Sequence, residues 1–142
     1  MPLTSEDRLA ISDLIALHGH LFDEGELERI DELFAADVVY DTSDFGQESM
    51  HGIDAIRSVA LALGDRNPVA HHVTNIVITP VDDDTASVQS KGLGVTSDGK
   101  CGSVTYIDAV TRTPAGWRIS HRRLQARRQP LNGLGAKSES PQ

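Results

Sequence analysis

Apolar residues recur at steps of three and four along the first part of the chain, the spacing of a helix that buries one face. The residues on this face are Ile11, Leu14, Ile15, His18, Leu21 and Phe22. Thr4 or Ser5 is positioned to cap the start of this helix, and Gly25 ends the pattern. The same spacing predicts a second, short helix over residues 27–34 and a third over residues 53–63.

After Pro68 the pattern changes to the β-branched composition and alternation of strands. The predicted strands cover residues 71–79, 85–95, 103–111 and 117–127. Turn signals separate them, which predicts an antiparallel meander. An earlier extended segment lies at residues 38–40. Residues 41–51 are polar without a clear period, so they predict a loop of the kind that can cover a pocket.

Helices that precede an antiparallel sheet are typical of the α+β class. A strongly curved antiparallel or mixed sheet can wrap around three N-terminal helices as a cone and leave a cavity at its open end. A chain of 142 residues is long enough for one such core and too short for two. We therefore expect one domain over residues 1–128 and a flexible tail over residues 129–142, which lacks an apolar period.

The formal charge of −8 disfavours nucleic acids and anionic membranes as partners, since phosphate contacts need clustered Lys and Arg. The basic residues at positions 118–128 are local and fit a strand whose alternate side chains face solvent. The single cysteine, Cys101, excludes an intrachain disulfide and fits a reducing compartment. The N-terminal residues do not match a signal peptide, and no apolar run reaches the ~20 residues of a membrane span. We expect a cytoplasmic protein.

Six histidines raise the question of a metal site. His18 and His20 do not share a helix face, and His71 and His72 point to opposite sides of a strand. The sequence has no His-Glu-x-x-His motif and no glycine-rich phosphate loop. It therefore predicts no metal and no cofactor.

Several segments together resemble the SnoaL-like branch of the NTF2-like superfamily, whose members are α+β cones. They are DRLAISDLI at residues 7–15, FDEG at 22–25, LFAADV at 33–38, HHVTN at 71–75 and GWRI at 116–119. Their order and spacing extend the resemblance over residues 5–128. Within this branch the chain resembles hexachlorocyclohexane dehydrochlorinase, scytalone dehydratase and the bile-acid 7α-dehydratases, which are lyases that need no cofactor.

The resemblance implies a general base made of Asp23, at the end of the first helix, and His71, on the sheet. Arg122 matches an arginine that assists the leaving group in the dehydrochlorinase. His18 stands where that enzyme has a lysine and where the dehydratases have a tyrosine nearby. Imidazole, ammonium and phenol differ in charge and acidity, so the leaving group stays open.

Strand alternation alone does not select the residues that face the cavity. Both faces of the strand at residues 71–79 mix polar and apolar groups, so the resemblance selects His71 over His72. Alternation sends Arg122 to the face opposite His121 and Arg123, unless a bulge intervenes.

Two classes of function fit these features. The first is a lyase in which His71 and Asp23 remove a proton from a small hydrophobic ring compound, while Arg122 and His18 stabilise the departing group. Ring isomerisation or polyketide-type cyclisation would use the same dyad, and Tyr40 and Asn75 are candidates to bind a substrate oxygen. The second is a non-catalytic ligand-binding or assembly module. We expect a homodimer or homotrimer in both cases, and an aliphatic pocket, because aromatic residues make up only 4% of the chain.

Overall fold

The computed structural model describes residues 3–135, so residues 136–142 of the predicted tail lie outside the described residues. The helices are α1 (Ser5–Asp23) and α2 (Ile53–Leu63), with the 3-10 helices η1 (Leu27–Glu32), η2 (Ser43–Phe45), η3 (Gly64–Arg66) and η4 (Pro130–Gly133). The strands are β1 (Phe34–Asp41), β2 (Met50–His51), β3 (Ala70–Pro80), β4 (Thr85–Val95), β5 (Cys101–Thr113) and β6 (Gly116–Ala126). The α+β class is confirmed.

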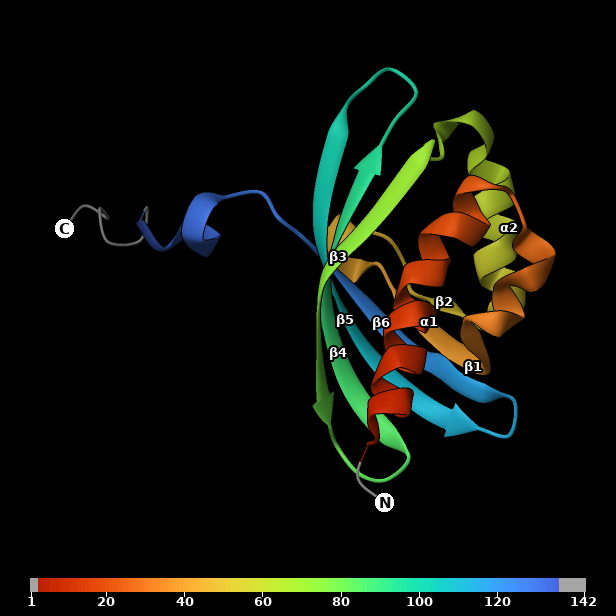
Figure 1. Cartoon of the computed structure of the whole chain (residues 1–142). Helices are drawn as coiled ribbons and strands as arrows, with labels where there is room; N and C mark the ends of the chain where they lie inside the picture. The colour runs from red at the N-terminus through yellow and green to blue at the C-terminus, as the bar shows by residue number, and fades with distance from the viewer. Residues whose placement is uncertain (1–2, 136–142) are drawn as a thin grey trace.

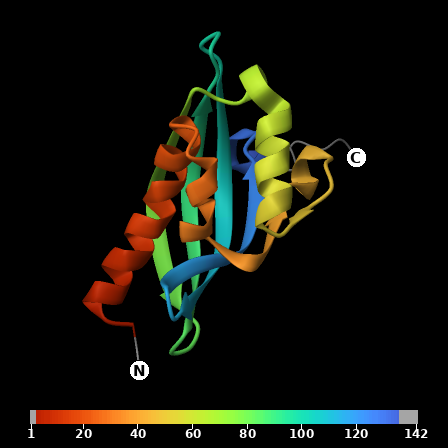
Figure 2. The ribbon, with the colours of Figure 1, turned by 90° about the vertical axis from the view of Figure 1, so that its right-hand side faces the viewer.

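The six strands form one sheet in the order β2-β1-β6-β5-β4-β3. Strands β3 to β6 make the predicted meander, and β1 pairs with β6 in parallel, so the sheet is mixed. The sheet curves, and α1 and α2 lie on its concave side (Figures 1 and 2). This arrangement confirms the expected cone.

Three connecting segments differ from the sequence prediction. The second helix is a single 3-10 helix that ends at Glu32, and Phe34 already belongs to β1. The polar loop at residues 41–51 contains η2 and the short edge strand β2. Within the predicted tail, η4 lies on the side of the sheet opposite α1 and α2 (Figure 1).

Helix α1 packs its apolar face into the sheet, and Ile11 and Ile15 are fully buried there. Thr4 is the N-cap, and its hydroxyl accepts a hydrogen bond from the Asp7 amide while the Asp7 carboxylate accepts one from the Thr4 amide. The same carboxylate accepts from Arg112 at 2.9 Å and from Trp117 at 3.3 Å. These contacts hold the pKa of Asp7 well below its usual range, and the Arg112 guanidinium contributes the most. These contacts fix the start of α1 against the β5–β6 hairpin.

Two bulges decide which strand residues face α1. In β3, Thr74 pairs with Lys91 but Val77 pairs with Gln89, and the extra residue Asn75 has a positive φ of 56°. Because of the extra residue, odd-numbered side chains before the bulge and even-numbered side chains after it lie on the same face of the sheet. His71 and Val73 face inward on one side of it, as Ile76 and Ile78 do on the other.

The second bulge lies in β6. Val110 of β5 pairs with Ile119, whereas Ala109 pairs with His121, so Ser120 is the extra residue. Ile119 and Arg122 are consequently both buried, although simple alternation assigns them to opposite faces. The bulge that the sequence analysis left open is therefore present.

Candidate active site

A cavity of about 390 Å³ opens between the concave face of the sheet, the end of α1, and α2. Its volume lies in the range typical of small-molecule sites. Helix α2 contributes an aliphatic wall made of Ile56, Val59, Ala60 and Leu63. The loop at residues 41–51 contributes Thr42, Phe45, Gln47 and Met50. That loop therefore forms part of the wall.

The cavity is more aromatic than the composition predicts. Both tyrosines of the chain and two of its three phenylalanines line it, namely Tyr40, Tyr106, Phe22 and Phe45. Among the described residues, no Lys, Arg, Asp or Glu forms part of the wall. The polar groups that do reach it are hydroxyls, amides and imidazoles. The wall therefore suits a largely apolar ligand that carries a few polar groups.

Asp23 and His71 meet at the edge of this cavity. The Oδ1 atom of Asp23 lies 2.6 Å from Nδ1 of the His71 ring. Both carboxylate oxygens also accept from the His71 backbone N–H, each at 3.0 Å. Asp23 thus holds the ring and the backbone of His71 at once. Their side chains are 23% and 18% exposed, respectively.

The glycine that follows His18 allows this contact. Helix α1 packs along β3, and a Cβ atom built on Gly19 would lie 2.7 Å from the backbone oxygen of His71. Only a residue without a side chain permits so close an approach. Asp23 is the last residue of α1, one turn beyond Gly19, so the close packing brings its carboxylate to His71.

His18 lies deeper in the same wall and is 2% exposed. Its ring centroid is 5.6 Å from that of His71 and 4.6 Å from that of Phe22. Burial, followed by the charges of Arg122 and His71, lowers the pKa of His18 well below its usual value. His18 is therefore a neutral imidazole, whose buried Nδ1 has no hydrogen-bond partner among residues 3–135.

Arg122 faces inward but does not line the cavity. Its side chain is fully buried, and it donates to both carboxylate oxygens of Asp108 at 2.7 and 2.8 Å. The Cζ atom of Arg122 lies 4.0 Å from the ring centroid of Tyr106, a residue of the cavity wall. Burial opposes the charge of Arg122, but Asp108 outweighs it and raises the pKa of the guanidinium. The expectation that Arg122 contacts a departing group is corrected, because Asp108 neutralises it behind Tyr106.

Tyr40 and Tyr106 both belong to the cavity wall. Tyr106 packs against Gly92, where a Cβ atom would lie 2.3 Å from its ring. The pKa values of both phenols are raised, and burial is the main cause. They therefore stay protonated and are suited to donate hydrogen bonds to a ligand oxygen.

The family model for the SnoaL-like domain matches residues 3–123. The chain belongs to the SnoaL-like family. The dyad, the buried pair beneath the cavity and every residue of the cavity lining except Leu124 lie within the matched residues of this SnoaL-like domain.

Solved structures of related proteins share the fold of this SnoaL-like domain. A Novosphingobium aromaticivorans protein provisionally assigned as an aromatic ring hydroxylase is 31% identical, with a TM-score of 0.72 over 89% of this chain and 92% of that chain. An NTF2-like protein with a cystatin-like fold from the same organism is 30% identical, with a TM-score of 0.72 over 94% and 88% of the two chains. No curated protein matches the chain.

A third structure from that organism, provisionally assigned as a scytalone dehydratase, is 22% identical. Its TM-score is 0.71, and the match covers 88% of this chain and 89% of that chain. At this level of identity the likeness supports the shared fold alone.

Asn75, a predicted substrate ligand, lies outside the cavity of this SnoaL-like domain. It is the exposed bulge residue of β3 and does not belong to the wall. Unbroken alternation would put Asn75 on the same face as His71, but the bulge turns it outward. This expectation is corrected.

The sequence analysis missed three residues that shape the site: Gly19, Tyr106 and Asp108. A glycine inside a strongly periodic helix is a signal for close packing, and an aspartate at the inward position of an apolar strand is a signal for a buried pair. These signals for Gly19 and Asp108 were both present in the sequence.

Two further properties bear on what this SnoaL-like domain binds. In residues 3–135, no cluster of three or more His, Cys, Asp or Glu side chains is arranged to hold a metal ion. Over the same residues, no helix combines the length and the apolar character needed to cross a membrane.

Proposed function

We propose that this protein is a cofactor-independent acid–base enzyme, a lyase or isomerase, that removes a proton from a small hydrophobic ring compound. The contact between Asp23 and His71 at the cavity wall carries the proposal. With Asp23 ionised, Nδ1 of His71 donates its proton to the carboxylate. The other ring nitrogen, Nε2, then has a free lone pair and is available as the general base.

The neutral state of His18 bears on the reaction type. A departing halide or hydroxide gains most from a cation, but His18 is uncharged and Arg122 is paired with Asp108. Neutral donors suit an oxyanion that forms as the proton leaves. Tyr40 and Tyr106, two residues of the wall, each carry such a donor. This favours a substrate with a carbonyl group beside the acidic carbon.

A ring ketone with a β-hydroxyl would lose water after this proton transfer, and a ring ketone with a double bond would isomerise. Dehydratase, isomerase and cyclase chemistry therefore share the first step. Dehydrohalogenation is the least supported of the predicted reactions, because no described cation reaches the cavity.

The direct test measures proton removal without knowledge of the natural product. The protein is incubated in D₂O with bicyclic ring ketones, with and without a β-hydroxyl group, and deuterium uptake and water loss are followed by mass spectrometry. We expect His71→Ala to lower the rate by about 10² or more, the scale of a lost general base. Asp23→Asn removes the charge that orients His71, so we expect a loss of similar size.

Two neighbouring variants serve as matched controls. His72 points to the opposite face of β3 and is exposed, and Glu24 follows Asp23 in the chain and is exposed. His72→Ala and Glu24→Gln should keep the wild-type rate. Equal rates for wild type and His71→Ala on every ketone would contradict the proposal.

The second candidate function is a ligand-binding module, which the largely apolar wall of the cavity favours. It predicts that ring ketones bind, with chemical shift changes at His18 and Tyr106, but exchange no hydrogen.

Self-association as a homodimer or homotrimer stays a prediction under both functions, and size-exclusion chromatography with light scattering measures it.

A further inference from the structure

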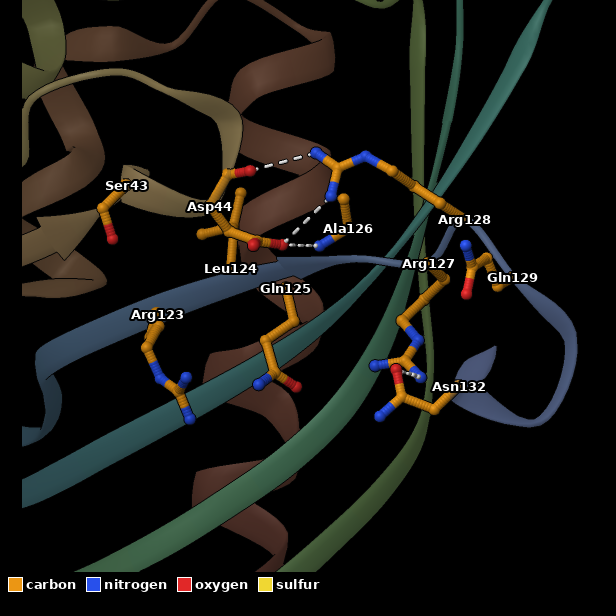
Figure 3. Close-up of a pocket in the computed structure, with 10 residues that line it drawn as sticks. All are labelled: Ser43, Asp44, Arg123, Leu124, Gln125, Ala126, Arg127, Arg128, Gln129 and Asn132. Atoms are coloured by element: carbon orange, nitrogen blue, oxygen red, sulfur yellow. Dashed lines mark hydrogen bonds and ion pairs between the residues drawn. The ribbon is translucent and has the colours of Figure 1, made fainter. Parts of the chain in front are cut away.

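A second hollow, of about 540 Å³, lies beside the outer face of β6 and contains neither Asp23 nor His71. We call it the outer groove, and it is lined by Ser43, Asp44, residues 123–129 and Asn132. Figure 3 shows that its side chains come from η2, from the end of β6 and from the segment that leads to η4. Arginines and amides dominate its surface.

The end of β6 arranges these groups in a row. Arg123 and Gln125 alternate within β6, and Arg127 follows the last residue of the strand, where its backbone N–H donates to the Ser103 oxygen at 3.1 Å. The three residues therefore share the outer face at steps of about 7 Å. Gln125 pairs with Thr105, and Thr105 pairs with Lys91. Lys91 therefore belongs to the same face, where its Nζ donates to the Thr105 hydroxyl at 3.0 Å. The face therefore carries positive charge on β4 and on β6, with the neutral Thr105 of β5 between them.

The arginines of the outer groove differ in their partners. Arg128 donates to the backbone oxygen of Asp44 at 3.0 Å and lies 3.6 Å from its carboxylate. Arg127 has one weak contact, to the Asn132 amide oxygen at 3.4 Å. Arg123 is exposed, and its guanidinium forms no hydrogen bond or ion pair with any residue in 3–135. Two guanidinium groups thus lack a carboxylate partner.

This pattern is unusual for a chain with a formal charge of −8. Three arginines surround one hollow, while Asp44 is the only acid in its described lining. Guanidinium groups bind phosphate and carboxylate through paired hydrogen bonds, and Gln125 adds a neutral amide donor between them. An anion in the groove would relieve the repulsion among these like charges.

We infer that the outer groove binds a small anion that carries two phosphate or carboxylate groups, held by Arg123 and Arg127. The two arginines are four residues apart in the chain, a separation that suits two anionic groups better than one. This site is independent of the proposed catalytic function, because it shares no residue with the dyad.

The test titrates pyrophosphate into ¹⁵N-labelled protein at low ionic strength, with citrate and inorganic phosphate in parallel. We expect saturable shifts of the Arg123 and Arg127 Nε signals and of the amides of residues 124–128. Pyrophosphate or citrate should bind more tightly than phosphate, and their ratio identifies whether phosphate or carboxylate is preferred. Added salt should weaken binding, since the groove is open to solvent.

Arg123→Gln and Arg127→Gln should each raise the dissociation constant about tenfold, as expected for the loss of one charge-assisted contact. Arg66→Gln, which removes an exposed arginine of η3 outside the groove, should leave it unchanged. Equal affinities for the groove variants and the control would overturn the inference. An oligomer that dissociates in Arg123→Gln without any anion effect would also overturn it, because the groove would then be an interface between copies.

Discussion

Replacing Asp108 by Asn tests the buried ion pair beneath the cavity. The side chains of Asp108 and Arg122 are both 0% exposed, and two hydrogen bonds of 2.7 and 2.8 Å join them. The variant keeps the shape but removes the only negative charge beside the guanidinium among the described residues. Loss of one partner of a buried pair costs about 3–5 kcal/mol, since the other charge stays buried without compensation.

This cost is large relative to the stability of a typical domain, which is about 5–15 kcal/mol. For a chain of this length it corresponds to a fall in the melting temperature of about 10–17 °C. Urea unfolding followed by the fluorescence of Trp117, which is 6% exposed and the only tryptophan, measures it directly. Asp65→Asn makes the same chemical change at an exposed site and should stay within about 0.5 kcal/mol of wild type.

Arg122→Met provides the complementary measurement. It leaves the Asp108 carboxylate buried without a cation, and this carboxylate can take up a proton whereas Arg122 cannot lose one. The deficit of Arg122→Met should therefore shrink as the pH falls, and that of Asp108→Asn should not. A cost below about 1 kcal/mol for Asp108→Asn, or identical pH dependence of the two variants, would refute the description of Arg122 as a neutralised buried cation.

Two further variants test the environment of the dyad. The pKa of His18 lies well below 6.5 in the folded state, so the unfolded chain binds one more proton as the pH falls. The unfolding free energy of wild type should therefore decrease by up to about 1.4 kcal/mol per pH unit below pH 6.5. In urea unfolding this slope should be absent in His18→Gln, and an unchanged slope would contradict the neutral imidazole. Gly19→Ala should displace His71 from Asp23 and cost about 1–3 kcal/mol with a loss of deuterium exchange. Gly102→Ala, whose Cβ would meet nothing within 4 Å, should stay as stable as wild type, and equal effects of the two changes would contradict the close packing of α1.

The elements of the fold were predictable because each depends on local pattern. The spacing predicted α2 to the residue, and the alternation predicted β4 to the residue. The 3-10 form of η1 was not predictable, since helical spacing over a few residues does not separate the two helix types. The parallel pairing of β1 with β6 joins distant segments and leaves no local signal.

The residues of the candidate site were likewise predictable only where a local pattern assigns them. His18 followed from the buried face of α1, because helical spacing alone assigns it there. The pairing of Asp23 with His71 came from the family resemblance, since it depends on how α1 lies against β3 over a separation of 48 residues. Composition suggested an aliphatic pocket, but an average over the chain does not reveal that both tyrosines gather on one wall.

The bulge at Ser120 explains why alternation failed where the chemistry is concentrated. Trp117 and Ile119 face inward, so without the bulge simple alternation would turn His121 and Arg123 inward as well and leave Arg122 facing solvent. The extra residue, whose hydroxyl donates to the Ala109 oxygen at 3.1 Å, shifts the phase by one position. Arg122 then turns inward to Asp108, and the arginine after it turns outward to the outer groove. One inserted residue therefore determines both the buried charge beneath the cavity and the cationic surface outside it.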